Sequence, residues 1–169
     1  MTPTQFTVVL EPMPLHPEVA LGAPAIRFSI PCFWVRKPPD TRVEWKAVLA
    51  TELSHSVIPR FVLERAAMRI DDLSVDPYAT WRGCACYVGT ARFGLPVNEW
   101  PRPAGQTTDA NRPLLPLSMR VLVPEEDPPG TPGQILFGMS FFVRYAARLR
   151  LDGLFPGDGQ ILIPGTPRA

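Results

Sequence analysis

The stretch LATELSHSVIP, residues 49–59, decides the fold because it links a predicted strand to a predicted helix through a polar turn. Before it, RVEWKAVL (residues 42–49) places an apolar residue at every second position, which is the period of a half-buried strand. After it, RFVLERAAMRI (residues 60–70) spaces its apolar residues along one side of a short helix. Pro59 suits a helix start because its missing N–H costs little there. Residues 42–70 are therefore predicted to form a strand–loop–helix unit.

A second unit of the same kind lies near the C-terminus. ILFG, residues 135–138, is a short apolar strand that stops at a glycine. SFFVRYAARL, residues 140–149, follows with helical spacing, and Ser140 is a candidate N-cap. We expect a helix at about residues 140–148.

The remaining apolar runs have the character of strands. Further strands are predicted at residues 25–35 and 116–124, two short ones within residues 80–97, and a final hairpin from residues 148–152 and 160–164. At glycines 83, 89 and 94 we expect the strand to bend or another segment of backbone to approach closely. The 22 prolines, well above the usual share of about 5%, lie between these runs, as in a β protein with long ordered loops. The chain is predicted to be mainly β.

The length of 169 residues suits one domain, which we place at residues 25–169 after an extended N-terminal arm at residues 1–24. The net charge of +1 favours neither nucleic acid nor an anionic membrane surface as a partner. No apolar run reaches the roughly 18 residues of a membrane-spanning helix. The N-terminus lacks the basic segment of a secretory signal, so we expect a cytoplasmic protein.

The three cysteines do not form a disulfide framework. Cys84 and Cys86 would share one face of a strand, but a metal site needs more ligands than these two. The two histidines, His16 and His55, lie far from them in the sequence. We therefore expect free buried thiols, no metal site and no cofactor.

The two strand–loop–helix units, in this order, resemble the retropepsin-like aspartic proteases, the single-lobed family that includes bacterial members. In that family a hydrophobic strand ends in Asp-Thr-Gly followed by Ala or Ser. Here Ala50, Thr51 and Glu52 occupy the three motif positions and Leu53 the fourth. Residues 135–138 match the later hydrophobic-hydrophobic-Gly strand of the family. The resemblance covers about residues 25–164 and implies a closed β barrel, the single lobe of the acid-protease fold, with one or two short helices.

The resemblance also implies a chemistry that this sequence cannot perform in the usual way. Family members use two carboxylates, one from each protomer, which share a proton and activate a water. Ala50 removes both carboxylates at once. Glu52 is expected to point elsewhere, and it adds bulk and charge where the family needs glycine. Ala50, Glu52 and Leu53 all depart from the motif, which favours natural loss over an engineered change at one position.

The role implied for such a chain is peptide binding or dimerisation without catalysis. The positions carried over as binding residues are Thr51, Leu53, Ser54, Gly83 and Gly138. The implied partners are an extended peptide or protein segment, and a second copy of the chain or an active relative.

Self-association should depend on two opposing features of the sequence. The apolar strand QILIP, residues 160–164, is available for contact with a partner, as terminal strands are in the family. Two Glu52 side chains near a two-fold axis would repel each other. We expect a weak homodimer.

Two other interpretations remain open. The chain could be an active aspartic endopeptidase, through Glu52 or through an aspartate at residue 50 in its unmodified form. It could instead be an unrelated β-sandwich interaction domain, in which residues 135–138 would not pass behind the Ala50 loop. A Ser-His nucleophile in Ser54-His55-Ser56 is disfavoured, because neighbouring residues of a strand point to opposite faces. The acidic residues at 71–72 and 125–127 are expected to be solvated surface.

Overall fold

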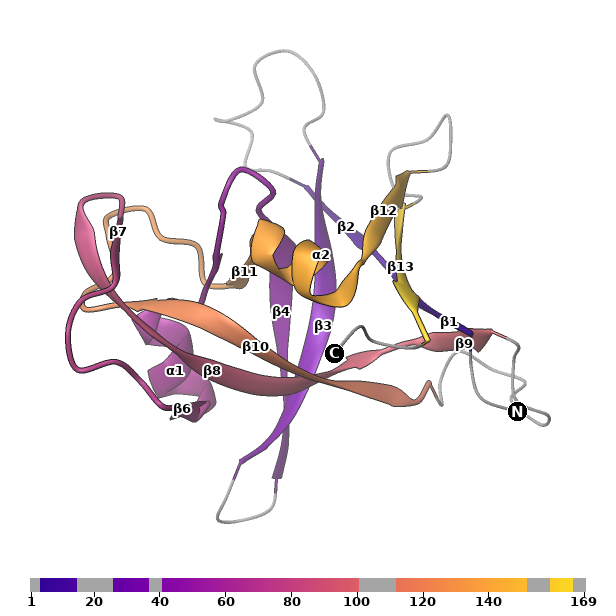
Figure 1. Cartoon of the computed structure of the whole chain (residues 1–169), viewed down its shortest axis with the longest axis horizontal. Helices are drawn as coiled ribbons and strands as arrows, with labels where there is room; N and C mark the ends of the chain where they lie inside the picture. The colour runs from indigo at the N-terminus through magenta and orange to yellow at the C-terminus, as the bar shows by residue number, and fades with distance from the viewer. Residues whose placement is uncertain (1–3, 15–25, 37–40, 101–111, 152–158, 166–169) are drawn as a thin grey trace.

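The computed structural model describes residues 4–14, 26–36, 41–100, 112–151 and 159–165, and its elements are mainly strands (Figure 1). The strands are β1 Gln5–Val9, β2 Glu11–Pro14, β3 Ile26–Arg36, β4 Thr41–Leu49, β5 Ser56–Val57, β6 Ile70–Asp71, β7 Ala79–Trp81, β8 Cys84–Pro96, β9 Asn98–Trp100, β10 Leu114–Pro124, β11 Ile135–Phe137, β12 Arg148–Leu151 and β13 Gly159–Pro164. The helices are α1 Arg60–Ala66 and α2 Met139–Tyr145. The prediction of a mainly β chain with two short helices is confirmed.

Six strands close into a barrel in the order β3-β4-β11-β5-β10-β8. A single pairing, Phe33 opposite Gly94, joins β8 back to β3 and completes the ring. Most neighbours are antiparallel, but β11 runs parallel to β4, and β5 runs parallel to β10. Closure removes the open sheet edges that would otherwise pair with other chains. The expected closed β barrel is therefore present.

A second sheet of four strands, in the order β12-β13-β1-β9, lies beside the barrel (Figure 1). Residues 5–9 and 11–14 of the expected N-terminal arm are extended and paired: β1 lies between β13 and β9, and β2 pairs with β3. The final hairpin is present as β12 and β13. However, β13 is paired on both sides within the chain. The expectation that residues 160–164 offer a free strand to a partner is therefore wrong.

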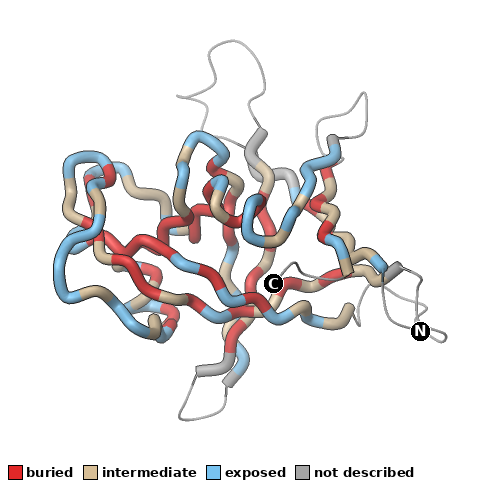
Figure 2. Tube along the Cα trace, in the orientation of Figure 1, coloured by how far each residue is buried: buried red, intermediate tan, exposed pale blue. Residues whose placement is uncertain are grey.

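The core follows the alternation read from the sequence. Along β10, Leu117, Met119, Val121 and Val123 are buried. Figure 2 shows that buried segments run through the strands of the barrel. Phe137 of β11 is fully buried, and its ring stacks on Phe93 and Phe141 at centroid distances of 5.5 and 4.8 Å. Stacked aromatic rings add to the free energy gained from burying their area. The strand β11 is thus anchored at the centre of the core.

The glycine-rich segment forms one short strand and one long strand. The long strand β8 passes through Gly89 and Gly94 without interruption. Between β7 and β8, Arg82 and Gly83 both have positive φ, 48° and 79°. Two such residues in a row form the tight turn whose twist matches a hairpin. Gly89 lies against Ile70, where an added Cβ would approach the Ile70 side chain to 2.3 Å.

The N-terminal ends of the two helices differ from what the sequence predicted. At α1 the Asp127 carboxylate accepts hydrogen bonds from the Arg60 and Phe61 amides at 2.7 and 2.8 Å. Asp127 is thus a helix cap supplied by a distant loop, not the solvated acid expected from the sequence.

At α2 the N-cap is Gly138 rather than Ser140. Ala146, in the left-handed conformation, ends α2 before residue 148. Within the described residues, no helix has the length and apolar character needed to cross a bilayer.

Replacing Asp127 by alanine should destabilise the fold by about 1–2 kcal/mol, because two amide donors at the start of α1 lose their acceptor. Chemical denaturation of both proteins measures this difference. The matched control is Glu126→Ala, which removes a neighbouring exposed acid with no role in the cap and should change stability by less than about 0.5 kcal/mol. Equal effects of the two changes would contradict the capping role.

Candidate functional site

The loop after β4 is built on Ala50, the first residue beyond the strand. The Ala50 amide donates to the Phe137 carbonyl, and the Ala50 carbonyl accepts from the Leu53 amide, both at 2.9 Å. These bonds close the turn formed by Thr51 and Glu52. Ala50 is only 4% exposed and belongs to a small buried cluster separate from the main core. Its methyl group therefore points into the protein, whereas Thr51 and Glu52 are exposed.

The segment Ile135–Gly138 passes directly behind this loop. β11 lies between β4 and β5, and its next residues bond to the loop backbone: the Met139 amide donates to the Leu53 carbonyl and the Ser140 amide to the Ser54 carbonyl, at 2.8 and 2.9 Å. The Gly138 amide donates to the buried Ser56 hydroxyl at 3.0 Å. This crossing is the arrangement expected from the resemblance and not from an unrelated β-sandwich.

Glycine is required at position 138 because the two backbones almost touch. A Cβ atom there would lie 2.4 Å from the His55 carbonyl oxygen and 2.8 Å from that of Leu53. Its φ of −85° is ordinary, so the constraint is space and not backbone conformation. Gly138 therefore supports the loop from beneath and is itself buried.

The β7–β8 hairpin covers the other side of the loop. Trp81 is 6% exposed and packs in the small cluster with Ala50, Val48 and Leu136. A small hollow of about 210 Å³ remains beside it, lined by Glu52, Leu53, Trp81, Arg82, Pro132 and Leu136. Sequence reasoning missed Trp81. The Arg82-Gly83 pair between two strand-like runs could have located the hairpin, but nothing in the sequence places the indole against Ala50.

The residues carried over as binding positions do not all reach one surface. Thr51 and Ser54 are exposed on the loop, and Leu53 is half-buried there. Gly83 is exposed at the tip of the hairpin, beside Arg82 of the small hollow. Gly138 lies behind the loop, out of reach of a ligand. The structure therefore gathers Thr51, Leu53 and Ser54 on one loop and leaves Gly83 on the covering hairpin.

The Ser54 hydroxyl and the Nδ1 atom of His55 share a hydrogen bond of 2.9 Å. The expectation that these side chains cannot meet is wrong, because Ser54 and His55 lie in a bend and not in a strand. The His55 ring has an edge contact with Tyr78 at 6.0 Å. Within the described part of the chain, no carboxylate orients the imidazole. The pair thus lacks the third group that activates a serine nucleophile.

The cysteines offer no reactive thiolate in the core. Burial raises the pKa of the Cys32 thiol, and burial is also the largest cause of the raised pKa of Cys86. Both thiols remain protonated at neutral pH, and all three cysteines are free. Cys84 is half-buried, which differs from the expected full burial. No cluster of metal-ligating side chains occurs among the residues that the structure describes.

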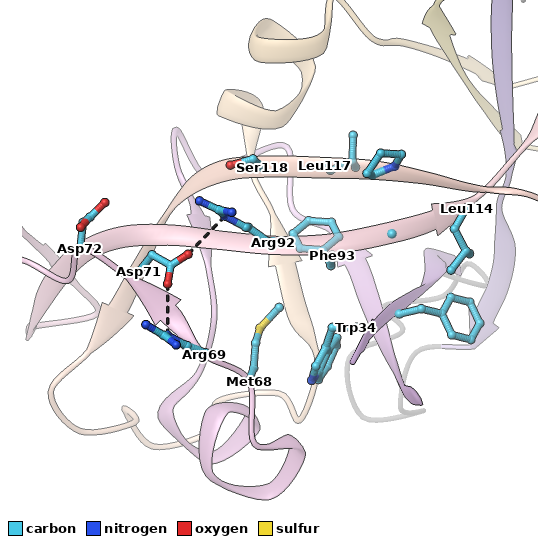
Figure 3. A pocket seen from close by; sticks show the side chains of 13 residues that line it. Trp34, Met68, Arg69, Asp71, Asp72, Arg92, Phe93, Leu114, Leu117 and Ser118 are labelled. Carbon is cyan, nitrogen blue, oxygen red and sulfur yellow. Dashed lines mark ion pairs between the residues drawn. The ribbon is translucent and has the colours of Figure 1, made fainter. Parts of the chain in front are cut away.

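A hollow of about 1270 Å³ lies away from the Ala50 loop, between β3, β6, β8 and β10 (Figure 3). Its polar end holds Asp71, whose two carboxylate oxygens pair with Arg69 and Arg92 at 3.3 and 3.2 Å. Asp71 is therefore a paired structural acid, which corrects the expectation of a solvated one. With both oxygens engaged by arginines, it is not placed to act as a catalytic acid or base.

No protein-family model matches the sequence, and no curated protein matches it. Among solved structures, the chain is similar to a retropepsin-like aspartic protease from Rickettsia conorii, with a TM-score of 0.40 and 14% identity over 94% of this chain and 89% of that one. It is also similar to the retroviral protease-like domain of Ddi1 from Leishmania major, with a TM-score of 0.36 and 13% identity over 78% of this chain and 91% of that one. At these values neither similarity assigns a family or an activity to the chain.

Replacing Gly138 by alanine should destabilise the fold by at least about 2–3 kcal/mol, because the new methyl group meets backbone that cannot move aside cheaply. Thermal and chemical unfolding measure the loss. Gly133→Ala is the matched control, since its Cβ would meet only the Phe61 ring edge at an ordinary 3.7 Å. Unchanged stability of the Gly138 variant would show that the two backbones are not held in contact.

Proposed function

We propose that the chain is a retropepsin-like domain that does not cleave peptides and that retains a peptide-binding or dimerisation role. One observation carries the proposal: Ala50 directly follows strand β4, in a loop backed by Gly138, at the position where the chemistry of aspartic proteases requires a carboxylate. The backbone frame of such a site is present, and its reacting group is replaced by a buried methyl.

Because the Ala50 side chain is buried, neither a solvent water nor a nearby side chain is placed to substitute for a catalytic carboxylate at this position. A general acid–base pair must hold a water within hydrogen-bond reach. Ala50 offers no polar atom beyond its backbone, and Trp81 packs in the same cluster. The Ala50 methyl group therefore lies among apolar side chains.

Glu52 does not stand in for the missing aspartate. It lies in the turn two residues further on, and it is exposed, whereas the Ala50 side chain is buried. Its carboxylate is therefore on the solvent side of the loop. A pair of glutamates on the outer side of two loops would repel each other instead of sharing a proton at short range.

A binding role is supported by the groups left exposed around the loop. Thr51 is exposed, and its hydroxyl makes no hydrogen bond within the described residues, so it is available to a partner. The small hollow beside Glu52 and Arg82 suits one side chain of an extended segment. β13 is already paired on both sides, so we propose that contact between two copies, or with an active relative, is made through the Ala50 loop and the β7–β8 hairpin.

The first test is turnover of peptide and protein substrates at mildly acidic pH. We expect none from the native chain, and the same background from Glu52→Gln, because neither protein carries a carboxylate at residue 50. Cleavage that is blocked by a transition-state mimic of aspartic proteases would contradict the proposal. If Glu52→Gln abolished that cleavage, Glu52 would be the catalytic group.

The second test is self-association, measured by sedimentation at low and high salt. We expect a weak homodimer that tightens in Glu52→Gly and becomes less dependent on salt, because like charges that face each other at an interface cost on the order of a few kcal/mol. Glu52→Gln is the matched control, since it removes the charge without adding backbone freedom. Strictly monomeric behaviour of all three proteins would exclude the dimer and leave a monomeric binding role.

A further inference from the structure

A second hollow, of about 400 Å³, lies between helix α2 and strand β10 and has an unusual lining. Its residues are Thr90, Ser118, Met119, Arg120, Ser140 and Arg144. Two of these are arginines and three carry hydroxyl groups, and no carboxylate is among them. The hollow therefore presents hydrogen-bond donors and positive charge with no acid to neutralise them.

The fold brings these groups together from three elements. Ser140 and Arg144 lie four residues apart on α2 and so share one face of the helix. Arg120 of β10 stands opposite Thr90 of β8 in the antiparallel ladder. Ser118 is two residues before Arg120 on the same strand face. One helix face and one sheet face thus enclose the hollow.

The two guanidinium groups are unpaired within the described part of the chain. Neither Arg120 nor Arg144 takes part in an ion pair or side-chain hydrogen bond there. The nearby arginines of the larger hollow differ, since Arg69 and Arg92 share Asp71 (Figure 3). Asp71 stands opposite Thr90 in the β6–β8 ladder, but its two oxygens are occupied by those arginines. The local field at the second hollow is therefore positive.

The walls of the hollow are held at a fixed distance. The Tyr145 hydroxyl accepts from the Ser118 amide and donates to the Ser118 carbonyl, both at 2.8 Å, which ties α2 to β10. At the start of α2 the Ser140 hydroxyl accepts from the Ser56 amide at 3.2 Å, which leaves its proton free to donate. The backbones of α2 and β10 are therefore held in place before a ligand binds, so the main ordering cost of binding is that of the side chains.

We propose that this hollow binds the phosphate group of a small soluble molecule, or free phosphate. Two planar guanidinium groups match a tetrahedral oxyanion with several acceptor oxygens, and the hydroxyls of Thr90, Ser118 and Ser140 supply the remaining donors. The volume suits a small molecule and not a folded partner. The site does not use the Ala50 loop, so it is independent of the function proposed above.

The test is titration calorimetry of the full chain at low ionic strength with two probes, inorganic phosphate and O-phosphoserine. We expect saturable binding of one phosphate group per chain. Arg120→Gln and Arg144→Gln should each weaken it about tenfold, as for the loss of one charged hydrogen-bond donor, and the double variant should remove it. Arg65→Gln on α1 is the matched control with the same loss of charge, and it should bind as the native chain does.

The two probes identify the source of the phosphate group. Tighter binding of O-phosphoserine assigns the site to an organic phosphate, and equal or weaker binding assigns it to the free anion. Binding of neither probe, or equal binding by the double variant, would overturn the proposal. Circular dichroism melts of each variant show whether a loss of binding comes from unfolding. Because the two arginine side chains are exposed, their replacement should leave the melting temperature unchanged.

Discussion

The close approach of Gly138 to the carbonyls of Leu53 and His55 is the constraint on which the rest of the structure depends. It lets β11 enter the barrel between β4 and β5 and bond to the loop from behind. Without that strand the ring would open, because β4 and β5 pair through β11. The same approach sets the start of α2, since the Met139 and Ser140 amides are bonded to the loop. Because Gly138 has no side chain, strand β11, the Ala50 loop and the start of α2 can be held together by backbone hydrogen bonds.

Sequence patterns predicted the parts of this structure that depend on the alternation of apolar residues. The faces of β4 and β10, the strand β11 before a glycine and the final hairpin all follow from local periodicity. The residues that sequence reasoning misplaced depend on long-range contacts. Asp127 caps a helix that begins 67 residues earlier in the chain, and Asp71 bridges two arginines, one of them on β8. The pairing of Asp127 with the start of α1, and of Asp71 with Arg92, leaves no local signal in the sequence.

The local backbone of the Ala50 loop was predicted, but the packing around it was not. The loop, its turn and the strand behind it were expected from two short motifs. The burial of Ala50 and Trp81 in one small apolar cluster was not, because it depends on how a hairpin folds over the loop. The Ser54–His55 hydrogen bond was misjudged, since residues taken for a strand lie in a bend. The availability of residues 160–164 was also misjudged, because β1 and β12 occupy both edges of that strand.

The bonds that hold the Ala50 loop do not involve the side chain of residue 50. Ala50 is held through its amide and carbonyl, and Gly138 contributes only backbone. Ser56 and Ser140 bond to amides on either side of the crossing. The methyl group of Ala50 adds apolar contact with the covering hairpin, where an ionised carboxylate would be desolvated at a cost of several kcal/mol unless it were paired. The packing of the loop therefore does not depend on a carboxylate at residue 50.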